Sequence, residues 1–400
     1  MDLRREGRIL YITTKDISLP IGPSVNEREF CWALNKLFRE RVHFLISEPR
    51  RTIAEAKDYS ITYVRSRGRS RLLDFSMQQI EFFKAGNGLL SSKDFDLIIS
   101  RMFAIPVWLF FLMRRNSVPL ALKHLTGYPD RPGQGWSLGK RVLWKVIAPF
   151  NKYLFRQIAG IAVGADACTK GHIKGIMQNL GIDPDRVLHV ENGTNTERFY
   201  PQDKAGARKK TGLLGFDPIV GYVGGRPWHR GGKEMVLAAP GLLERYPKVG
   251  FVIVGGGVGM DSLMALAKEK RVLDHFVFPG FVDYEDVADY INSFDVGIAL
   301  GRPEKFTSVG NSAQKIRQYI SCGKPVVSSP GGSEFILEHS LGSVVDSRNV
   351  NAVADAIGKW LALPHDEKDM HAKRARLYAE ANFSIELILK TRVEWWNNWL

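Results

Sequence analysis

Short apolar runs alternate with longer segments of helical periodicity through the first half of the chain. Helical spacing covers residues 28–39 and 170–180, and the apolar runs are rich in β-branched residues. Parallel strands covered on both faces are apolar at nearly every position, so we interpret these runs as buried strands. They lie at 8–14, 42–47, 95–100, 119–125, 161–163 and 187–191. The alternation predicts a doubly wound parallel α/β domain.

The second half repeats this alternation. Its helical patterns include 204–211, 352–363 and 366–400, and the last of these is rich in tryptophan. Further buried strands are expected at 219–223, 251–254, 276–280 and 325–327; the run 296–300 leads into the segment 310–330, and 343–346 closes the domain. We therefore predict a second parallel α/β domain followed by C-terminal helices.

Residues 310–330 form a loop, a helix, a tight turn and a buried strand in immediate succession. Gly310, Asn311 and Ser312 supply N-cap chemistry for a helix over 313–322, which Gly323 ends. The free N–H groups of such a helix, with Lys315 in its first turn, suit a pyrophosphate. A capped surface helix with a solvated lysine is the alternative, and these residues alone do not choose between them.

Further candidates follow predicted strands, at the sheet edge where open α/β sheets bind ligands. Gly22 lies in the loop after the first strand, and His124 at the end of the fourth. Gly224 and Gly225 follow the strand 219–223, and three cations come directly after them: Arg226, Arg230 and Lys233. Clustered cations of this kind suit a diphosphate. The alternatives are a structural histidine and a solvated basic loop.

Composition places the chain among ordinary globular proteins. Its 400 residues are 44% hydrophobic and 24% charged, which suits two domains with separate cores. Cys31, Cys168 and Cys322 lie far apart, as reduced thiols do, and a reducing cytoplasmic setting follows. Charges recur before the first strand, unlike in a signal peptide. The longest apolar run, 104–113, is shorter than the roughly 20 residues that a membrane-spanning helix needs.

The net charge of +14 is carried mostly by the first half of the chain, which indicates an anionic partner there. Residues 139–159 interleave cations with apolar side chains, among them Trp144 and Phe150, as a helix in an anionic membrane interface does. A core-packed helix with a charged outer face is the alternative. The cations are Lys140, Arg141, Lys145, Lys152 and Arg156. Alternating arginines at 65–71 could bind a polyanion, and a solvated loop is the alternative.

The second half also resembles a known family. KIRQYISCGKPVVSSPGGSEFI, together with ENGTNTERFYP, VGYVGGRPWHRGGKEM and FVIVGGG upstream, is similar to retaining glycosyltransferases of the GT-B fold, family 4 (group 1). The resemblance implies two facing Rossmann-like domains and a C-terminal helix that crosses back to the first. We place the domains at 1–195 and 196–375, with the crossing helix at 376–400.

The resemblance also implies roles for individual residues. Arg226 and Arg230 would clamp the donor phosphates, with Lys233 as the alternative to Arg230, and His124 would act at the donor sugar. The other donor-binding positions are Gly22, Gly225, Asn311, Ser312, Lys315, Gln318 and Glu334. Because the protein's cations neutralise the phosphates, we expect no metal and no other cofactor. Gly310 and Gln318 stand where many members carry a pair of glutamates.

The function expected from this resemblance is transfer of a sugar, with retention, from a nucleotide diphosphate to a lipid-linked or glycan acceptor. The product would be a cell-surface polysaccharide or a glycolipid. We expect a cytoplasmic enzyme, peripheral on the inner face of the cytoplasmic membrane. A nucleotide-sugar epimerase or phosphorylase, or a non-catalytic basic binding module, remains the alternative. Nucleic acid is an unlikely partner, since the chain shows no nucleic-acid-binding motif.

Overall fold

The computed structural model describes residues 2–3, 5–65, 71–101, 105–125, 137–301, 310 and 312–400. Its contacts divide the chain into two compact units. The first comprises Met1–Leu19, Phe30–Glu191 and Leu389–Leu400, and the second Pro20–Glu29 and Asn192–Ile388. The start of helix α1 (Gly22–Phe38) therefore groups with the second unit, and the end of helix α15 (Ile385–Asn397) with the first.

The first unit contains a seven-stranded sheet, parallel throughout, in the order β3-β2-β1-β4-β5-β6-β7. The strands are β1 (Ile9–Thr13), β2 (Val42–Ser47), β3 (Ser60–Val64), β4 (Leu97–Ser100), β5 (Leu120–Leu122), β6 (Gly164–Ala167) and β7 (Val187–His189). All residues of β1, β2 and β4 are buried, as expected for strands covered on both faces.

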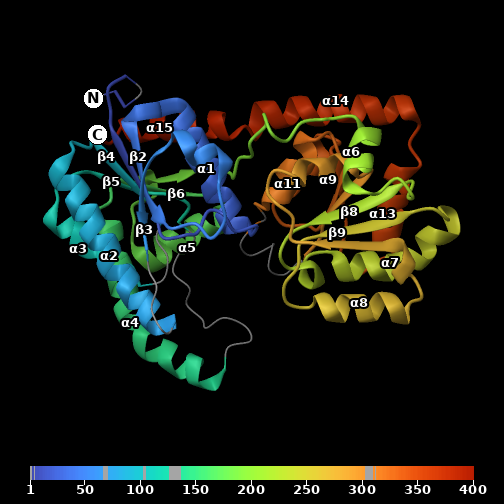
Figure 1. Cartoon of the computed structure of the whole chain (residues 1–400), viewed down its shortest axis with the longest axis horizontal. Coiled ribbons are helices and arrows are strands. Elements are labelled where there is room, and N and C mark those ends of the chain that lie inside the picture. The colour runs from blue at the N-terminus through green and yellow to red at the C-terminus, as the bar shows by residue number, and fades with distance from the viewer. Residues whose placement is uncertain are drawn as a thin grey trace. The chain divides into compact units, whose positions relative to one another are not determined.

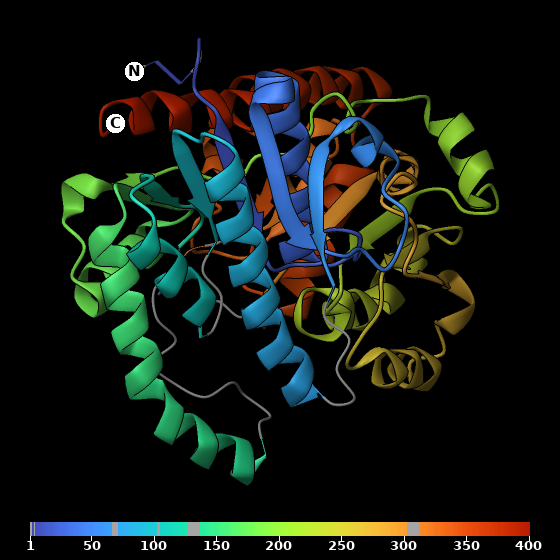
Figure 2. The same cartoon turned by 60° about the vertical axis from the view of Figure 1, so that its left-hand side comes forward.

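Four helices pack on one face of this sheet, where they share its hydrophobic core. They are α2 (Arg71–Ser92), α3 (Val107–Arg115), α4 (Leu138–Ile161) and α5 (Lys170–Leu180). The C-terminal half of α4 carries buried Leu154, Phe155 and Ile158. Its N-terminal half extends beyond the sheet (Figures 1 and 2). Among the described residues, no helix is long and apolar enough to cross a membrane.

The second unit contains a six-stranded parallel sheet in the order β10-β9-β8-β11-β12-β13. The strands are β8 (Ile219–Val223), β9 (Gly250–Val254), β10 (Phe276–Gly280), β11 (Val296–Ala299), β12 (Val326–Ser328) and β13 (Gly342–Val344). Its helices are α6 (Lys204–Thr211), α7 (Gly232–Arg245), α8 (Met260–Glu269), α9 (Val287–Ser293), α11 (Gln314–Ser321), α12 (Phe335–Glu338), α13 (Val350–Leu361) and α14 (His365–Asn382).

Two separate cores cover the two faces of this sheet. Val220 and Tyr222 of β8 pack with α7, α8 and α13, whereas Ile219 packs with α9, α11 and α14 (Figure 1). Alternate residues of a strand point to opposite faces, so one short strand contributes side chains to both cores. The predicted pair of parallel α/β sheets is confirmed.

Several local expectations are wrong. The apolar run 161–163 ends helix α4 and leads into β6, whose residues Gly164–Ala167 include buried Asp166. The first helix begins at Gly22, six residues before the predicted start. The helix expected over 313–322 spans Gln314–Ser321 instead. Part of the arginine-rich run 65–71 lies outside the described residues, but Arg65 follows β3 and Arg71 begins α2, elements that the sequence pattern does not reveal.

A buried carboxylate holds the start of α1 within the second unit. Oε1 of Glu29 accepts hydrogen bonds from Tyr284 Oη at 2.6 Å and Thr194 Oγ1 at 3.3 Å, and its Oε2 accepts one from Gln314 Nε2. Burial raises the pKa of Glu29 from 4.5 to about 7, although hydrogen bonds from Tyr284, Gln318, Thr194 and the Asn195 backbone oppose the shift.

This cluster predicts a pH-dependent stability. Between pH 4.5 and 7 the folded state binds more protons at Glu29 than the unfolded state, so the carboxyl's contribution to stability falls as pH rises through that range. Urea unfolding of the wild type and Glu29→Gln, from pH 5 to 8, should show the wild type losing about 2 kcal/mol relative to the variant. A difference that does not change with pH would contradict this.

Candidate functional site

Two glycine turns meet where β8 and β9 end. The N–H of Gly224 donates to the Val254 carbonyl at 2.9 Å, and that of Gly255 to the Gly280 carbonyl at 2.7 Å. A Cβ on Gly255, whose φ is 115°, would lie 2.2 Å from the Gly224 carbonyl oxygen. A Cβ on Gly257 would lie 2.7 Å from the Gly225 carbonyl oxygen. Neither position tolerates a side chain, so bare backbone forms this edge of the sheet.

Lys315 lies directly against the first of these turns. Its Nζ is 3.5 Å from the ring centroid of Tyr222 and 3.0 Å from the place of a Cβ on Gly224. The Nζ atom is buried, and the described residues offer it no hydrogen-bond partner. Burial, with a smaller contribution from the charge of Arg230, holds the pKa of Lys315 well below its usual value. Buried amines are normally hydrogen-bonded, so this one suits an anionic ligand.

The other predicted cations differ in their surroundings. Arg230 is half-buried, and burial lowers its pKa, while Tyr222 opposes that shift and Arg226 adds to it. Arg226 is exposed. Lys233 is also exposed, with its Nζ 5.7 Å from the ring centroid of Trp228. The charge of Arg230 thus acts on Lys315, and that of Arg226 acts on Arg230, so Arg230 lies near both other cations.

The structure also brings Gly22 to this place. Gly22 begins α1 and has open space where a Cβ would be. The neighbouring Ile21 has its Cγ2 3.8 Å from the position of a Cβ on Gly225. The residue before Gly22 therefore lies beside a turn that is some 200 residues away in the sequence.

The remaining donor-site candidates of the second unit are engaged with the protein itself. Ser312 does not cap α11: its Oγ accepts the N–H of Asn192 at 3.3 Å, and Ala313 takes the N-cap position. Gln318 is buried and faces Glu29. The Glu334 carboxylate accepts the N–H groups of Gly331 and Gly332, at 3.0 and 2.7 Å. These bonds lower its pKa although burial opposes them. Asn311 lies outside the described residues.

His124 belongs to the first unit and follows β5. Its φ is 50°, and its N–H donates to Asp166 Oδ1 at 3.1 Å. Its pKa is held well below the usual value by burial first, and then by the charges of Arg101, Lys123, Arg392 and His172. The imidazole is therefore neutral near pH 7.

Sequence reasoning misses the side chains that support these candidates. Tyr319 Oη accepts the N–H of Val223 at 2.8 Å, which fixes the end of β8. Tyr222 supplies the ring beneath Lys315. Tyr222 lies within the glycine motif VGYVGG, where alternation with Val223 could have indicated that it points into the core.

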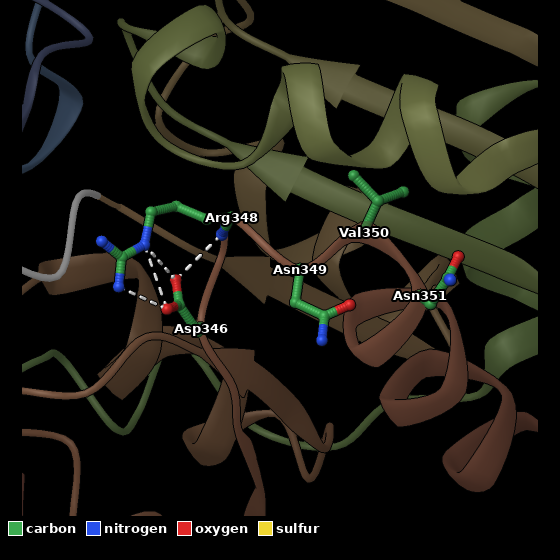
Figure 3. Close-up of a pocket in the computed structure, with 5 residues that line it drawn as sticks. All are labelled: Asp346, Arg348, Asn349, Val350 and Asn351. Atoms are coloured by element: carbon green, nitrogen blue, oxygen red, sulfur yellow. Dashed lines mark hydrogen bonds and ion pairs between the residues drawn. The ribbon is translucent and has the colours of Figure 1, made fainter.

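A shallow hollow at the start of α13 is a different feature of the second unit (Figure 3). It is lined by Asp346, Arg348, Asn349, Val350 and Asn351. Its charges pair with each other, since Nη2 of Arg348 lies 2.6 Å from Asp346 Oδ2, and Asn349 caps α13. The hollow therefore offers a ligand no unpaired charge.

The described part of the chain contains no group of three His, Cys, Asp or Glu side chains that could hold a metal ion. Two Asp-x-Asp pairs occur in the sequence, at 94–96 and 183–185. Asp96 accepts the N–H of Arg8 at 2.7 Å, and Asp183 that of Asp185 at 3.0 Å. The expectation of a metal-independent reaction stays a prediction.

Comparison with solved structures defines the class of fold. Sucrose-phosphate synthase from Thermosynechococcus elongatus superimposes with a TM-score of 0.71 over 98% of this chain and 99% of its own, at 19% identity. At this identity the likeness shows the fold alone. The protein is a GT-B-type chain with two parallel α/β sheets, as the sequence predicts.

Comparison of sequences identifies the second unit. Residues 203–378 match the family model of glycosyl transferases group 1. A GDP-mannose-dependent alpha-(1-6)-phosphatidylinositol monomannoside mannosyltransferase from Mycolicibacterium smegmatis is 30% identical over 44% of this chain and 47% of its own. A D-inositol 3-phosphate glycosyltransferase from Mycobacteroides abscessus is 30% identical over 54% and 47%.

The matched part spans about half the length of these curated relatives. The predicted resemblance is confirmed over residues 203–378, which match this family model. That region holds both glycine turns, Arg226, Arg230 and Lys315.

From the surroundings of Lys315 we predict that this residue lowers the free energy of unfolding of the wild-type protein. Lys315→Met removes a buried amine without a partner, and should raise the free energy of unfolding by about 1 kcal/mol. Lys324 is the matched control, because its Nζ donates to the Asn292 carbonyl at 2.8 Å. Lys324→Met should lower stability by about 1 kcal/mol. Urea titrations measure both, and a destabilised Lys315→Met would show that its amine is satisfied in the folded chain.

Proposed function

We propose that the protein transfers a sugar from a nucleotide-diphosphate donor to an acceptor hydroxyl. The observation that carries this proposal is the buried Lys315 amine, which has no hydrogen-bond partner in the described chain and lies against the bare backbone at Gly224. The diphosphate would take the place beside Lys315 and Arg230, and the glycines would let its oxygens approach the backbone.

The chemistry follows from where charge develops. The bond between the anomeric carbon and the diphosphate oxygen breaks, and its electron pair stays on the diphosphate. The acceptor oxygen forms the new glycosidic bond and gives up its proton, which the leaving diphosphate oxygen takes. Arg226, Arg230 and Lys315 would stabilise the charge that grows on the leaving group. Neutral His124 would hydrogen-bond to the donor sugar. Retention at the anomeric carbon, and a reaction without metal, are parts of the proposal.

The acceptor is proposed to be lipid-linked or glycan in nature. Relatives similar over about half of this chain act, by name, on phosphatidylinositol monomannoside and on D-inositol 3-phosphate. The product would enter cell-surface polysaccharide or glycolipid synthesis. The helix α4 adds an observation of its own, because its N-terminal half exposes apolar side chains next to cations.

Loss of the clamp should slow transfer without unfolding the protein. Arg230→Ala and Arg226→Ala should each lower turnover by roughly 10²-fold, because a contact to the transition state is lost. Arg245→Ala, which removes an exposed ion pair to Asp355, is the matched control and should keep wild-type turnover. Product analysis after incubation with sugar nucleotides and acceptor measures the rates.

Three outcomes would contradict this proposal. Wild-type turnover in both clamp variants would move the role to Lys233. An epimerised sugar nucleotide formed without acceptor would replace transfer by epimerisation. Calorimetric titration of nucleoside diphosphates, with and without chelator, tests the metal: binding that disappears with chelator would refute the metal-free clamp.

We propose further that the start of α4 docks on an anionic membrane. Leu138, Val142, Val146 and Phe150 recur every four residues and are 53% to 79% exposed. Arg141 and Lys145 between them are exposed as well. Apolar side chains beside cations suit the boundary between lipid headgroups and acyl chains. The N-terminal half of α4, which carries these residues, extends beyond the sheet (Figure 2).

Two residues of the predicted docking set have other roles. Trp144 is half-buried and packs against the core of the first unit, so it does not insert. Arg156 donates from its Nε to the Asn179 carbonyl at 3.0 Å. The Lys140 side chain lies outside the described residues. Phe150, Arg141, Lys145 and Lys152 remain.

Liposome binding should depend on this half of α4. Changing Arg141, Lys145 and Lys152 to Gln should abolish most sedimentation with anionic vesicles, because each cation near the surface contributes on the order of 1 kcal/mol. Changing three exposed lysines of the second unit, Lys209, Lys248 and Lys268, is the control of equal charge and should leave binding intact. Equal loss in both variants would mean that net charge alone attracts the lipid.

A further inference from the structure

The backbone at His124 adopts a left-handed conformation that most residues avoid, with φ at 50°. Both hydrogen bonds that hold this turn come from one residue of the neighbouring strand β6. The His124 N–H donates to Asp166 Oδ1 at 3.1 Å, and the Leu125 N–H donates to the Asp166 carbonyl at 2.7 Å. Asp166 therefore holds the backbone of His124 and Leu125, the turn that follows β5.

Asp166 in turn depends on the C-terminal helix. Its side chain is 0% exposed, and that of Arg392 on α15 is 2% exposed. Arg392 binds both carboxylate oxygens, Nε to Oδ2 at 3.1 Å and Nη2 to Oδ1 at 3.0 Å. A carboxylate buried this completely is strongly destabilising without a cation, so the paired charge keeps Asp166 in place. The two residues are 226 positions apart.

Neighbouring packing fixes Arg392 itself. Its guanidinium lies 5.5 Å from the ring centroid of Phe30, and the Nζ of Lys123 lies 4.4 Å from the same ring. Three residues further along α15, the indole of Trp395 fills the space beside Gly164, leaving no room there for a Cβ. Because a planar guanidinium binds a carboxylate through two bonds, Lys cannot replace it without a change in geometry.

We infer that Arg392 is a positioning residue: acting through Asp166, it holds the turn that presents the His124 imidazole to the donor sugar. This inference rests on the proposed transfer reaction. The imidazole is placed to receive a ligand, because its Nδ1 is buried and has no hydrogen-bond partner among the described residues. Its Nε2 lies 3.7 Å from Cys168 Sγ. The charged and titratable groups around it are Arg101, Lys123, Asp166, His172 and Arg392.

A double-mutant cycle separates positioning from general support of the fold. Arg392→Lys should lower kcat by roughly tenfold or more in the wild type but by less than about twofold in His124→Ala, because the residue acts through His124. The affinity for nucleoside diphosphate, measured by calorimetry, should not change, since Arg230 and Lys315 belong to the other unit. An equal loss of kcat in both backgrounds would overturn the inference.

Arg186→Lys is the matched control. Arg186 is a structural arginine of the same unit, whose Nε donates to the Val163 carbonyl at 3.2 Å and whose Nη2 donates to that of Ala162. Arg186→Lys should change kcat by the same factor in the wild type and in His124→Ala. If Arg392→Lys does not fold, Asp166→Asn replaces it, because it breaks the same ion pair, and the same dependence on His124 is expected.

A readout without catalysis keeps this test apart from the proposed function. Proton–carbon NMR correlations of the histidine rings, with the His124 signal assigned by its absence in His124→Ala, report the imidazole's surroundings directly. The His124 signal should shift in Arg392→Lys and stay in place in Arg186→Lys. A wild type that transfers no sugar would refute the function alone, whereas an unmoved His124 signal would refute the positioning.

Discussion

Backbone pairing between parallel strands is the constraint on which both units depend. Parallel neighbours cannot be joined by a tight turn, so each strand must be followed by a crossover, and the carboxyl ends of all strands fall on one edge. In the second unit this edge gathers the ends of β8 and β9 and the turn at Gly224. In the first it places His124, after β5, next to Asp166 of β6. Strand pairing therefore brings the candidate residues of each unit to one edge of its sheet.

Three buried ionisable groups show how differently a protein can treat a charge. Asp166 is paired with Arg392 through two bonds, and such a pair serves the fold. Glu29 has only neutral donors around it, so its pKa rises and its charge depends on pH. Lys315 has an aromatic ring and a bare turn beside it but no hydrogen bond from the described chain. Among the three, only Lys315 lacks a hydrogen-bond partner in that part of the protein, which is why it carries the functional proposal.

Helix α4 combines two alternatives that the sequence leaves open. Leu154, Phe155 and Ile158 in its C-terminal half are buried against the sheet, as in a core-packed helix. Val142, Val146 and Phe150 in its N-terminal half are exposed, and this half extends beyond the sheet (Figure 2). A stripe of apolar residues that continues past the edge of its sheet loses its partner there. The core-packed alternative thus describes the C-terminal half, and membrane docking of the exposed half stays a proposal.

The sequence by itself determines the fold class, most strands and the positions of the glycine turns. Periodicity is a local property that can be read along the chain. Glycines such as Gly224 and Gly255 mark backbone positions that other residues do not readily occupy. The sequence also places Arg226, Arg230 and Lys315 in one region that resembles a known family. It misses β6, because GADA is short and holds a buried aspartate that only a distant arginine makes acceptable.

Only the tertiary structure decides which polar residues are already engaged. Ser312, Gln318 and Glu334 look alike in the sequence as possible donor contacts, yet the first two bond to distant residues and Glu334 bonds to its own turn. Lys315 and Lys324 lie on the same short segment. Lys324 donates a hydrogen bond to the Asn292 carbonyl, whereas the Lys315 amine has no partner among the described residues. Hydrogen-bond partners are set by distances across the fold, which join residues as remote as Asp166 and Arg392. No local pattern records such pairs, so the roles of these side chains emerge only when the chain is folded.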